Sequence, residues 1–284
     1  MYAIAYCPRP AVCAKHFLAA GGPGRESPGC GQVILGGAME LDAFGWVMAV
    51  LAAVSVGMAK GGLPMISSLS VPLLAGVMNP VAAAGLLLPV YIVSDLFGLI
   101  AYRRDFDARV LKILVPATAL GVGFGWATAS VVPETAVTAL VGLIGVVFAL
   151  NALLRPSLGA ARTARLAPGL FWGTITGFTS FVSHSGGPPY QAYTIPLNLP
   201  RTVFAGTSTL LFAWVNAIKL IPYAALGQIN VTSLGTALTL APVAAVSVFF
   251  GVKLVRILPH ETFYKLVTWA LLLISLKLLW DLLP

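Results

Sequence analysis

Charged residues are scarce in this chain. Only 9% of its 284 residues are Asp, Glu, Lys or Arg, whereas soluble globular domains contain about 25%. Hydrophobic residues make up 58%, and the mean hydropathy is +0.93. Several apolar runs reach the roughly 20 residues that a bilayer-spanning helix needs. They are continuous, unlike the alternating segments of about ten residues in a membrane barrel. The composition therefore predicts an all-α polytopic membrane protein within a lipid bilayer.

Acidic residues are fewer than basic ones, nine against 17, and the formal net charge is +8. A basic protein that binds nucleic acid carries its charge along one face or stripe. Here the Lys and Arg residues lie between the apolar runs instead. We therefore expect no nucleic-acid partner.

Cysteine is missing from the apolar part of the chain, because Cys7, Cys13 and Cys30 all lie in the first 30 residues. No disulfide or metal site therefore frames the membrane region. Together with His16, these cysteines match no standard zinc spacing. We expect no metal site and no cofactor.

Two enzyme signatures are also missing, the HExxH zinc motif and the GxSxG nucleophile elbow. A serine hydrolase built on Ser185 would need a histidine from another helix. Apart from the adjacent His184, the only histidine past residue 39 is His260, in a predicted cytoplasmic linker. An intramembrane enzyme is therefore a weak alternative, and we do not expect an enzyme.

The chain divides into four parts. Residues 1–38 are rich in Gly, Pro and Cys, and their longest apolar stretch is too short for a signal-peptide core. We predict that Met39 is the natural start and that 1–38 is a disordered or non-native extension. Residues 39–155 and 167–284 are predicted to form two transmembrane repeats, joined by a cytoplasmic linker over 156–166.

Two glycine-proline breaks interrupt the apolar runs at matching places in the two repeats. They are Lys60–Pro64 and His184–Pro189. Glycine loosens a helix and proline removes a backbone donor, so such residues are disfavoured inside a membrane helix. Paired breaks in related halves point to a transporter's substrate site. The expected apolar segments are 41–58, 63–78, 80–101, 110–131, 134–154, 168–183, 188–199, 202–226, 232–256 and 261–283.

A series of matching residues occurs in the same order in the two halves, which suggests duplication. The matched positions are Gly61-Gly62-Leu63-Pro64 with Gly186-Gly187-Pro188-Pro189, Pro72 with Pro196, Ala84-Gly85 with Ala205-Gly206, Asp95 with Asn216, Tyr102 with Tyr223, Pro116 with Pro242, Gly125 with Gly251, and Pro133 with Pro259.

Lys and Arg residues collect on the cytoplasmic side of a membrane protein. They occupy the linkers after 80–101, 134–154 and 232–256, and are missing around Pro133 and over 227–230. This pattern predicts that the two broken pairs are hairpins that enter from opposite faces. Each half is then one broken helical hairpin plus three transmembrane helices, and the repeats are inverted. One crossing per broken pair would instead make the repeats parallel, which fits the charges less well.

The breaks combine features that suit an anion. A freed helix N-terminus carries partial positive charge, and proline is well tolerated in a first helical turn. We expect helices to start at Pro64 and Pro189. Lys60 adds a full charge at the first break, although it could instead extend to the headgroups. His184 at the second break could bind the anion, carry a coupling proton or be a core histidine.

Further candidates surround these two. The predicted substrate-binding residues are Lys60, Gly61, Gly62, Pro64, Ser183, His184, Ser185, Gly186, Gly187 and Gln191. The serines could also bond to their own helix. Coupling or gating candidates are Asp95, Asn216, Thr207 and Ser208. Asp95 could bind a cation or proton, or neutralise Lys60 or Lys219. We expect Lys219 and Lys277 to extend to the membrane surface.

These motifs resemble the paired signature of the TauE/SafE sulfite exporter family. They are Gly61-Gly62-Leu63-Pro64, the stretch from Ser183 to Gln191, Ala205-Gly206-Thr207-Ser208 and Leu226-Gly227-Gln228-Ile229. The resemblance covers about residues 43–283. It implies an inner-membrane permease that moves small anions, often sulfur-containing ones such as sulfite or sulfonates.

The predicted function is a secondary transporter of small anions in a bacterial inner (plasma) membrane. The substrate would be sulfite, sulfoacetate or a related organosulfonate, held between the two glycine-proline tips during alternating access. An anion channel is an alternative. The sequence leaves open a coupling proton or sodium ion and assembly as a homodimer.

Overall fold

The computed structural model describes residues 41–75, 77–78, 80–129, 131, 133–154, 162–226 and 231–282. The predicted extension 1–38, most of the predicted linker 156–166 and the 227–230 linker lie outside these residues. The described residues all belong to the compact unit Met39–Pro284.

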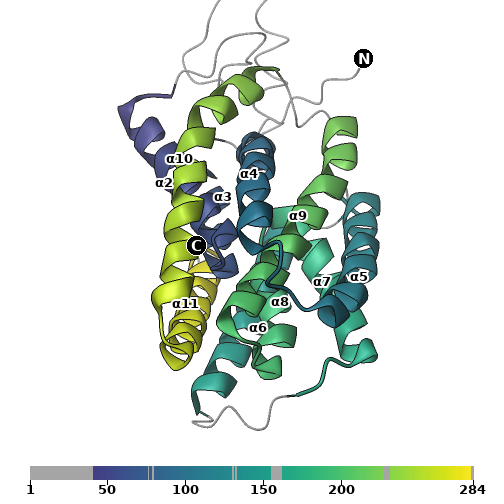
Figure 1. Ribbon diagram of the computed structural model, residues 1–284. Helices are drawn as coiled ribbons and strands as arrows, with labels where there is room; N and C mark the ends of the chain where they lie inside the picture. The colour runs from purple at the N-terminus through teal and green to yellow at the C-terminus, as the bar shows by residue number, and fades with distance from the viewer. Residues whose placement is uncertain are drawn as a thin grey trace, which may run out of the picture. The chain divides into compact units, whose positions relative to one another are not determined.

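The described residues form a bundle of helices (Figure 1). In order these are α2 (Ala43–Lys60), the 3₁₀ helix η1 (Pro64–Leu69), α3 (Ser70–Ala75), α4 (Pro80–Tyr102), α5 (Ala108–Ala127), α6 (Glu134–Leu154), α7 (Leu166–Ser183), α8 (Gly187–Thr194), the 3₁₀ helix η2 (Ile195–Leu197), α9 (Arg201–Ala225), α10 (Val231–Ile257) and α11 (His260–Trp280). Six of them, α2, α4, α5, α9, α10 and α11, are long and apolar enough to cross a membrane.

The bundle exposes an apolar surface and buries polar side chains within its otherwise hydrophobic core, as expected of a polytopic membrane protein. Ile100, Ile221 and Trp280 are exposed on its surface. Polar side chains such as Thr118, Gln191 and Lys219 are buried instead. A membrane interior tolerates apolar surface and penalises unpaired polar groups, so this distribution suits lipid rather than water.

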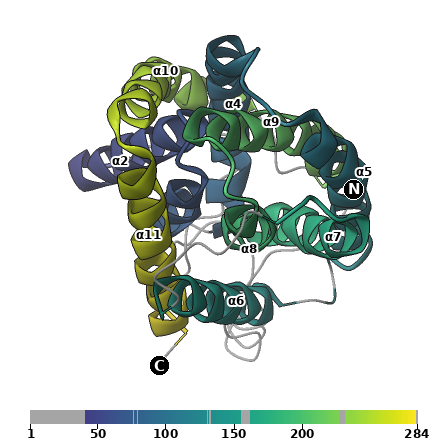
Figure 2. The ribbon, with the colours of Figure 1, turned by 60° about the horizontal axis from the view of Figure 1, so that its bottom comes forward.

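The two breaks end helices as predicted, and each is followed by short helical pieces. α2 ends at Lys60 and η1 begins at Pro64, the predicted start. α7 ends at Ser183, but α8 begins at Gly187, two residues before the predicted start at Pro189. Proline explains why the pieces are short. Each proline lacks a backbone donor, so η1 opens on one proline and η2 contains another. Figure 2 shows α8 near the middle of the bundle beside α7, and α8 packs on α6 and α7.

The largest helix contacts recur when each helix is exchanged for its predicted counterpart. α2 packs on α10 as α7 packs on α5, and α4 packs on α10 as α9 packs on α5. Two pairs, α4 with α9 and α6 with α11, join counterparts directly. A two-fold relation between the halves would produce this set of contacts.

The counterpart helices run in opposite directions. On α4 and α9, Gly98 lies beside Thr209 while Tyr102 lies beside Gly206. On α6 and α11, Gly142 lies against Leu279 and Gly145 against Ser275. Rising numbers on one helix thus face falling numbers on the other, so each pair is antiparallel. The orientation of the two halves in a membrane stays a prediction.

Small residues let these helices approach closely. A Cβ atom at Gly121 of α5 would lie 2.1 Å from the carbonyl oxygen of Thr174 on α7. One at Gly177 of α7 would lie 2.1 Å from the carbonyl oxygen of Thr118. Without a hydrophobic force between helices in lipid, such close backbone packing supplies much of the association.

Gly121→Ala should therefore destabilise the protein, and Gly123→Ala should not. Overpacking costs about 1–3 kcal/mol, because the α5 and α7 backbones must separate. A Cβ atom at Gly123, two residues along the same helix, meets nothing within 4 Å. Thermal unfolding of the purified protein in detergent measures both variants. Equal melting temperatures for the two variants would contradict the packing described here.

Candidate functional site

At the first break, backbone hydrogen bonds connect the glycine turn to the end of α2. The N–H of Gly61 donates to Gly57 O at 2.8 Å and that of Gly62 to Ala59 O at 3.1 Å, which satisfies carbonyls at the end of α2. Gly62 has a φ of +113°, which side-chain-bearing residues rarely adopt. From α4, the Tyr102 hydroxyl donates to Gly61 O at 2.6 Å. The turn is thereby fixed against the next helix of its own half.

The second break has an equivalent tie. His184 ends α7 in a left-handed conformation with φ 53°. Its N–H donates to Ser180 O at 3.2 Å. From α9, the Tyr223 hydroxyl donates to Phe181 O at 3.0 Å. Tyr102 and Tyr223 are the counterparts that the repeat alignment predicts, and each holds the break of its own half.

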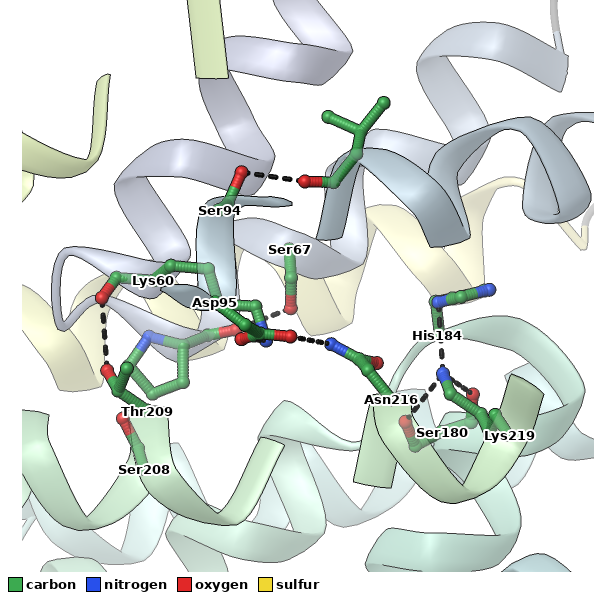
Figure 3. A network of polar contacts seen from close by, with 12 residues as sticks. Lys60, Ser67, Ser94, Asp95, Ser180, His184, Ser208, Thr209, Asn216 and Lys219 are labelled. Carbon is green, nitrogen blue, oxygen red and sulfur yellow. Dashed lines mark hydrogen bonds and ion pairs between the residues drawn. The ribbon is translucent and has the colours of Figure 1, made fainter. Parts of the chain in front are cut away.

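Lys60, Asp95 and Asn216 form one buried polar chain (Figure 3). Lys60 Nζ lies 2.6 Å from Asp95 Oδ1, and Asn216 Nδ2 donates to Asp95 Oδ2 at 2.8 Å. Each of these residues is only 3% exposed. Of the roles considered for Asp95, the structure shows pairing with Lys60. The two predicted counterparts, Asp95 of α4 and Asn216 of α9, bond directly to each other.

Aromatic rings connect this chain to the second break. Lys60 Nζ lies 5.2 Å from the centre of the Tyr91 ring and 5.8 Å from that of Phe212, within range of cation–π attraction. The Tyr91 ring also stacks on the His184 ring, with centroids 5.2 Å apart and planes 5° from parallel. The Tyr91 hydroxyl bonds to Ser70 Oγ at 2.8 Å. Tyr91 thus lies between the residues of the two tips.

Lys219 does not reach the membrane surface, so that prediction was wrong. Its side chain is fully buried, at 0% exposure. Its ammonium donates to Ser180 O at 3.1 Å and Ser180 Oγ at 3.3 Å, and lies 3.2 Å from His184 Nδ1. The α9 helix turns Lys219 inward, toward the end of α7. Lys277, in contrast, is exposed and pairs with Asp281, four residues along α11.

The sequence contains a pattern that places Lys219 inside the bundle, although its distance from the predicted helix end suggested the membrane surface. Thr209, Phe212, Asn216, Lys219 and Tyr223 follow one another at spacings of three, four, three and four residues. That spacing places them on one face of a helix. All but Phe212 are buried, so this face of α9 points into the bundle.

Lys60, Asp95, Asn216, Lys219 and His184 together form a buried cluster, and this cluster carries an excess of positive charge. Two lysines and one carboxylate are buried together, and Lys60 is the lysine paired with Asp95. Within the described ranges, no carboxylate lies within ion-pair distance of Lys219. With a neutral His184, the buried charge sums to one positive unit when both lysines are protonated.

A cavity of about 20 Å³ lies inside this cluster. Its lining comes from α2, η1, α4, α7 and α9: Ala59, Lys60, Pro64, Ser67, Tyr91, Ser180, His184, Ser208, Thr209, Phe212 and Asn216. A single water needs at least about 10–15 Å³ by this measure. Anything larger than a water or two therefore requires the walls to separate.

The other predicted site residues have varied surroundings. Ser183, Ser185 and Ser208 hydrogen-bond to carbonyls of Thr179, Ser183 and Ala205 in their own segments. Thr207 Oγ1 accepts the N–H of Asp107, which ties α9 to the start of α5. Gly186 and Gly187 lie at the start of α8, where the Tyr190 N–H donates to Gly186 O at 3.2 Å. The Gln191 side chain is fully buried, and no described residue bonds to its amide.

Comparison with known proteins places this architecture in one family. The model of the sulfite exporter TauE/SafE family matches residues 46–278, which include both breaks and every residue of the cluster. No curated protein and no solved structure gave a significant match. The chain is thus a multi-pass membrane protein that belongs to the TauE/SafE sulfite exporter family, a family of membrane transporters.

Proposed function

We propose that the protein is a secondary transporter of small anions, of which sulfite, sulfoacetate and related organosulfonates are the foremost candidates. The single observation that carries this proposal is the buried cluster of two lysines with one carboxylate at the meeting point of the two helix breaks. The family match supports the transport class. The cluster supports the sign of the substrate charge.

The electrostatic reason is the cost of an uncompensated buried charge. Transfer of a lone ammonium from water into a protein interior costs several kcal/mol. Lys60 is compensated by Asp95, but Lys219 has only neutral neighbours at hydrogen-bond distance. An anion in the adjoining cavity would offset that cost. A cationic substrate would increase it.

The cavity suggests how the substrate would move. Its walls come from both halves, Lys60 and Tyr91 from the first, His184 and Asn216 from the second. Because it holds little more than a water, the halves must separate to admit an anion. We infer alternating access, in which inverted halves rock about the α4–α9 contact and expose the tips to one side at a time. The bacterial inner membrane is the setting that we propose.

Binding and uptake test this proposal. A panel of sulfite, sulfoacetate, methanesulfonate, sulfate and chloride is added to the purified protein during thermal unfolding. A ligand at about 100 times its Kd adds about 2.7 kcal/mol of stability, which corresponds to about 5–10 °C for a chain of this size.

Uptake of radiolabelled sulfite and sulfoacetate into proteoliposomes should be saturable, and each anion should compete with the other. His184→Ala should reduce that uptake, whereas Lys277→Met, a change at an exposed lysine, should not. If no anion of the panel stabilises the protein or enters the vesicles, the proposal fails. Unitary currents in planar bilayers would assign the protein to the channels instead.

A further inference from the structure

We propose that the buried Lys219–His184 pair carries the coupling proton, so that one proton is taken up with each monoanion that binds. This inference rests on the proposed function and specifies how it is driven. It starts from an arrangement of two bases, Lys219 Nζ and His184 Nδ1, only 3.2 Å apart and both buried.

The contacts around His184 fit one assignment of hydrogen-bond donors and acceptors. A Lys219 ammonium donates to His184 Nδ1, which leaves the imidazole proton on Nε2. That Nε2–H then donates to the Tyr223 oxygen at 3.1 Å, and the Tyr223 hydroxyl donates to Phe181 O at 3.0 Å. The chain accounts for each of these groups with a neutral imidazole.

The pair therefore has room for one labile proton. In its charged form, that proton is shared between Lys219 Nζ and His184 Nδ1. A second proton would place two cations 3.2 Å apart in a buried site, where repulsion is scarcely screened. Loss of the first proton leaves a neutral amine beside a neutral imidazole. The amine keeps two N–H donors for Ser180 O and His184 Nδ1, and its lone pair then accepts the Ser180 hydroxyl proton, which reverses that one hydrogen bond.

The surrounding groups leave this charge without a fixed counterion. Tyr223 faces the pair from α9, Tyr91 stacks on the His184 ring from α4, and Ser180 accepts from Lys219 on α7. The nearest other charges are Lys60 and Asp95, which compensate each other at 2.6 Å. The charge of the pair is thus the one that remains unbalanced.

Proton and anion consequently stabilise each other. With the site empty, a charged pair bears the cost of an isolated buried cation. With an anion present, the charged pair is its counterion. Because such coupling is reciprocal, anion binding must raise proton affinity, and protonation must raise anion affinity equally. The loaded site is then neutral, so transport of a monoanion moves no net charge.

The experiment measures protons directly. Methanesulfonate serves as probe, because its sulfonate stays ionised and does not itself exchange protons near neutral pH. It is mixed with purified wild-type protein in weakly buffered detergent solution containing a pH indicator. We expect an alkaline shift of about one proton per bound anion. Over the same range, the Kd should fall by up to about tenfold for each unit by which the pH is lowered.

Two variants locate the proton. Lys219→Met should abolish the alkaline shift, and Lys277→Met, at an exposed lysine on α11, should leave it unchanged. If Lys219→Met does not fold, the wild-type measurement still decides. Methanesulfonate binding with no proton uptake and a Kd independent of pH would overturn the inference and leave the proposed function standing. Failure of the whole anion panel to bind would overturn both.

Proteoliposomes give the electrical counterpart. Uptake of radiolabelled methanesulfonate should be driven by an inward proton gradient and should be unaffected when a potassium diffusion potential is imposed. Uptake that follows the potential but not the proton gradient would contradict coupling at this pair. Uptake that needs a sodium gradient would assign the coupling to a different ion.

Discussion

Lys60→Met should lower the free energy of unfolding by about 3–5 kcal/mol, because it leaves the Asp95 carboxylate buried without its cation. The pair is 2.6 Å apart, and both partners are almost completely buried. Asp95→Asn should cost a comparable amount, since it strands Lys60. The double variant Lys60→Met/Asp95→Asn removes both charges and keeps a carbonyl oxygen for the Asn216 amide. It should recover most of the loss, and a double-mutant cycle measures the coupling.

The control is Lys277→Met, which breaks an exposed pair with Asp281 and should change stability by less than about 1 kcal/mol. Anion binding and uptake by the stable double variant distinguish a role of Lys60 in binding from its role in stability. The stable double variant still lacks the Lys60 ammonium in the cavity wall, so anion affinity should fall about 10–100-fold, the usual range for a lost hydrogen bond to a charged group. Additive single effects on stability would contradict the Lys60–Asp95 pair, and unimpaired anion affinity in the double variant would exclude Lys60 from the anion site.

Much of the fold could be predicted from apolar runs and prolines. The expected segment 134–154 coincides with α6, and the breaks lie where glycine and proline interrupt the pattern. The pattern did not predict the secondary structure of the two segments that follow the breaks. The predicted segments 63–78 and 188–199 are each divided into a short helix and a 3₁₀ helix. Hydropathy records burial along the chain, whereas this division follows from backbone donors that proline removes.

The site was harder to predict because it depends on partners from distant parts of the chain. Lys60, Asp95 and His184 could be selected because each is a polar residue within or beside an apolar segment. The stacking of Tyr91 on His184 could not be predicted, because it depends on how α4 packs against the end of α7. Lys219 was misassigned for a specific reason. Distance from the nearest loop suggested that it could reach water, but helical phase decides where a side chain points. Its phase, shared with Asn216 and Tyr223, directs it inward.

Gly62→Ala should destabilise the protein by about 2–6 kcal/mol, through two separate effects. At φ +113° an alanine is strained, which costs of the order of 1–3 kcal/mol. Its Cβ atom would also lie 2.5 Å from the Ala205 Cβ and 2.8 Å from the Tyr102 hydroxyl, so overpacking adds about 1–3 kcal/mol. Thermal unfolding in detergent measures the sum.

Gly235→Ala on α10 is the matched control, because a Cβ atom there meets nothing within 4 Å and the helical backbone accepts alanine. It should leave stability unchanged or raise it by up to about 1 kcal/mol. Because Tyr102 holds Gly61 in the same turn, the strain should also displace Lys60, and uptake should fall in whatever fraction of Gly62→Ala remains folded. A fully stable Gly62→Ala protein with normal uptake would mean that the turn adopts another backbone path in the membrane.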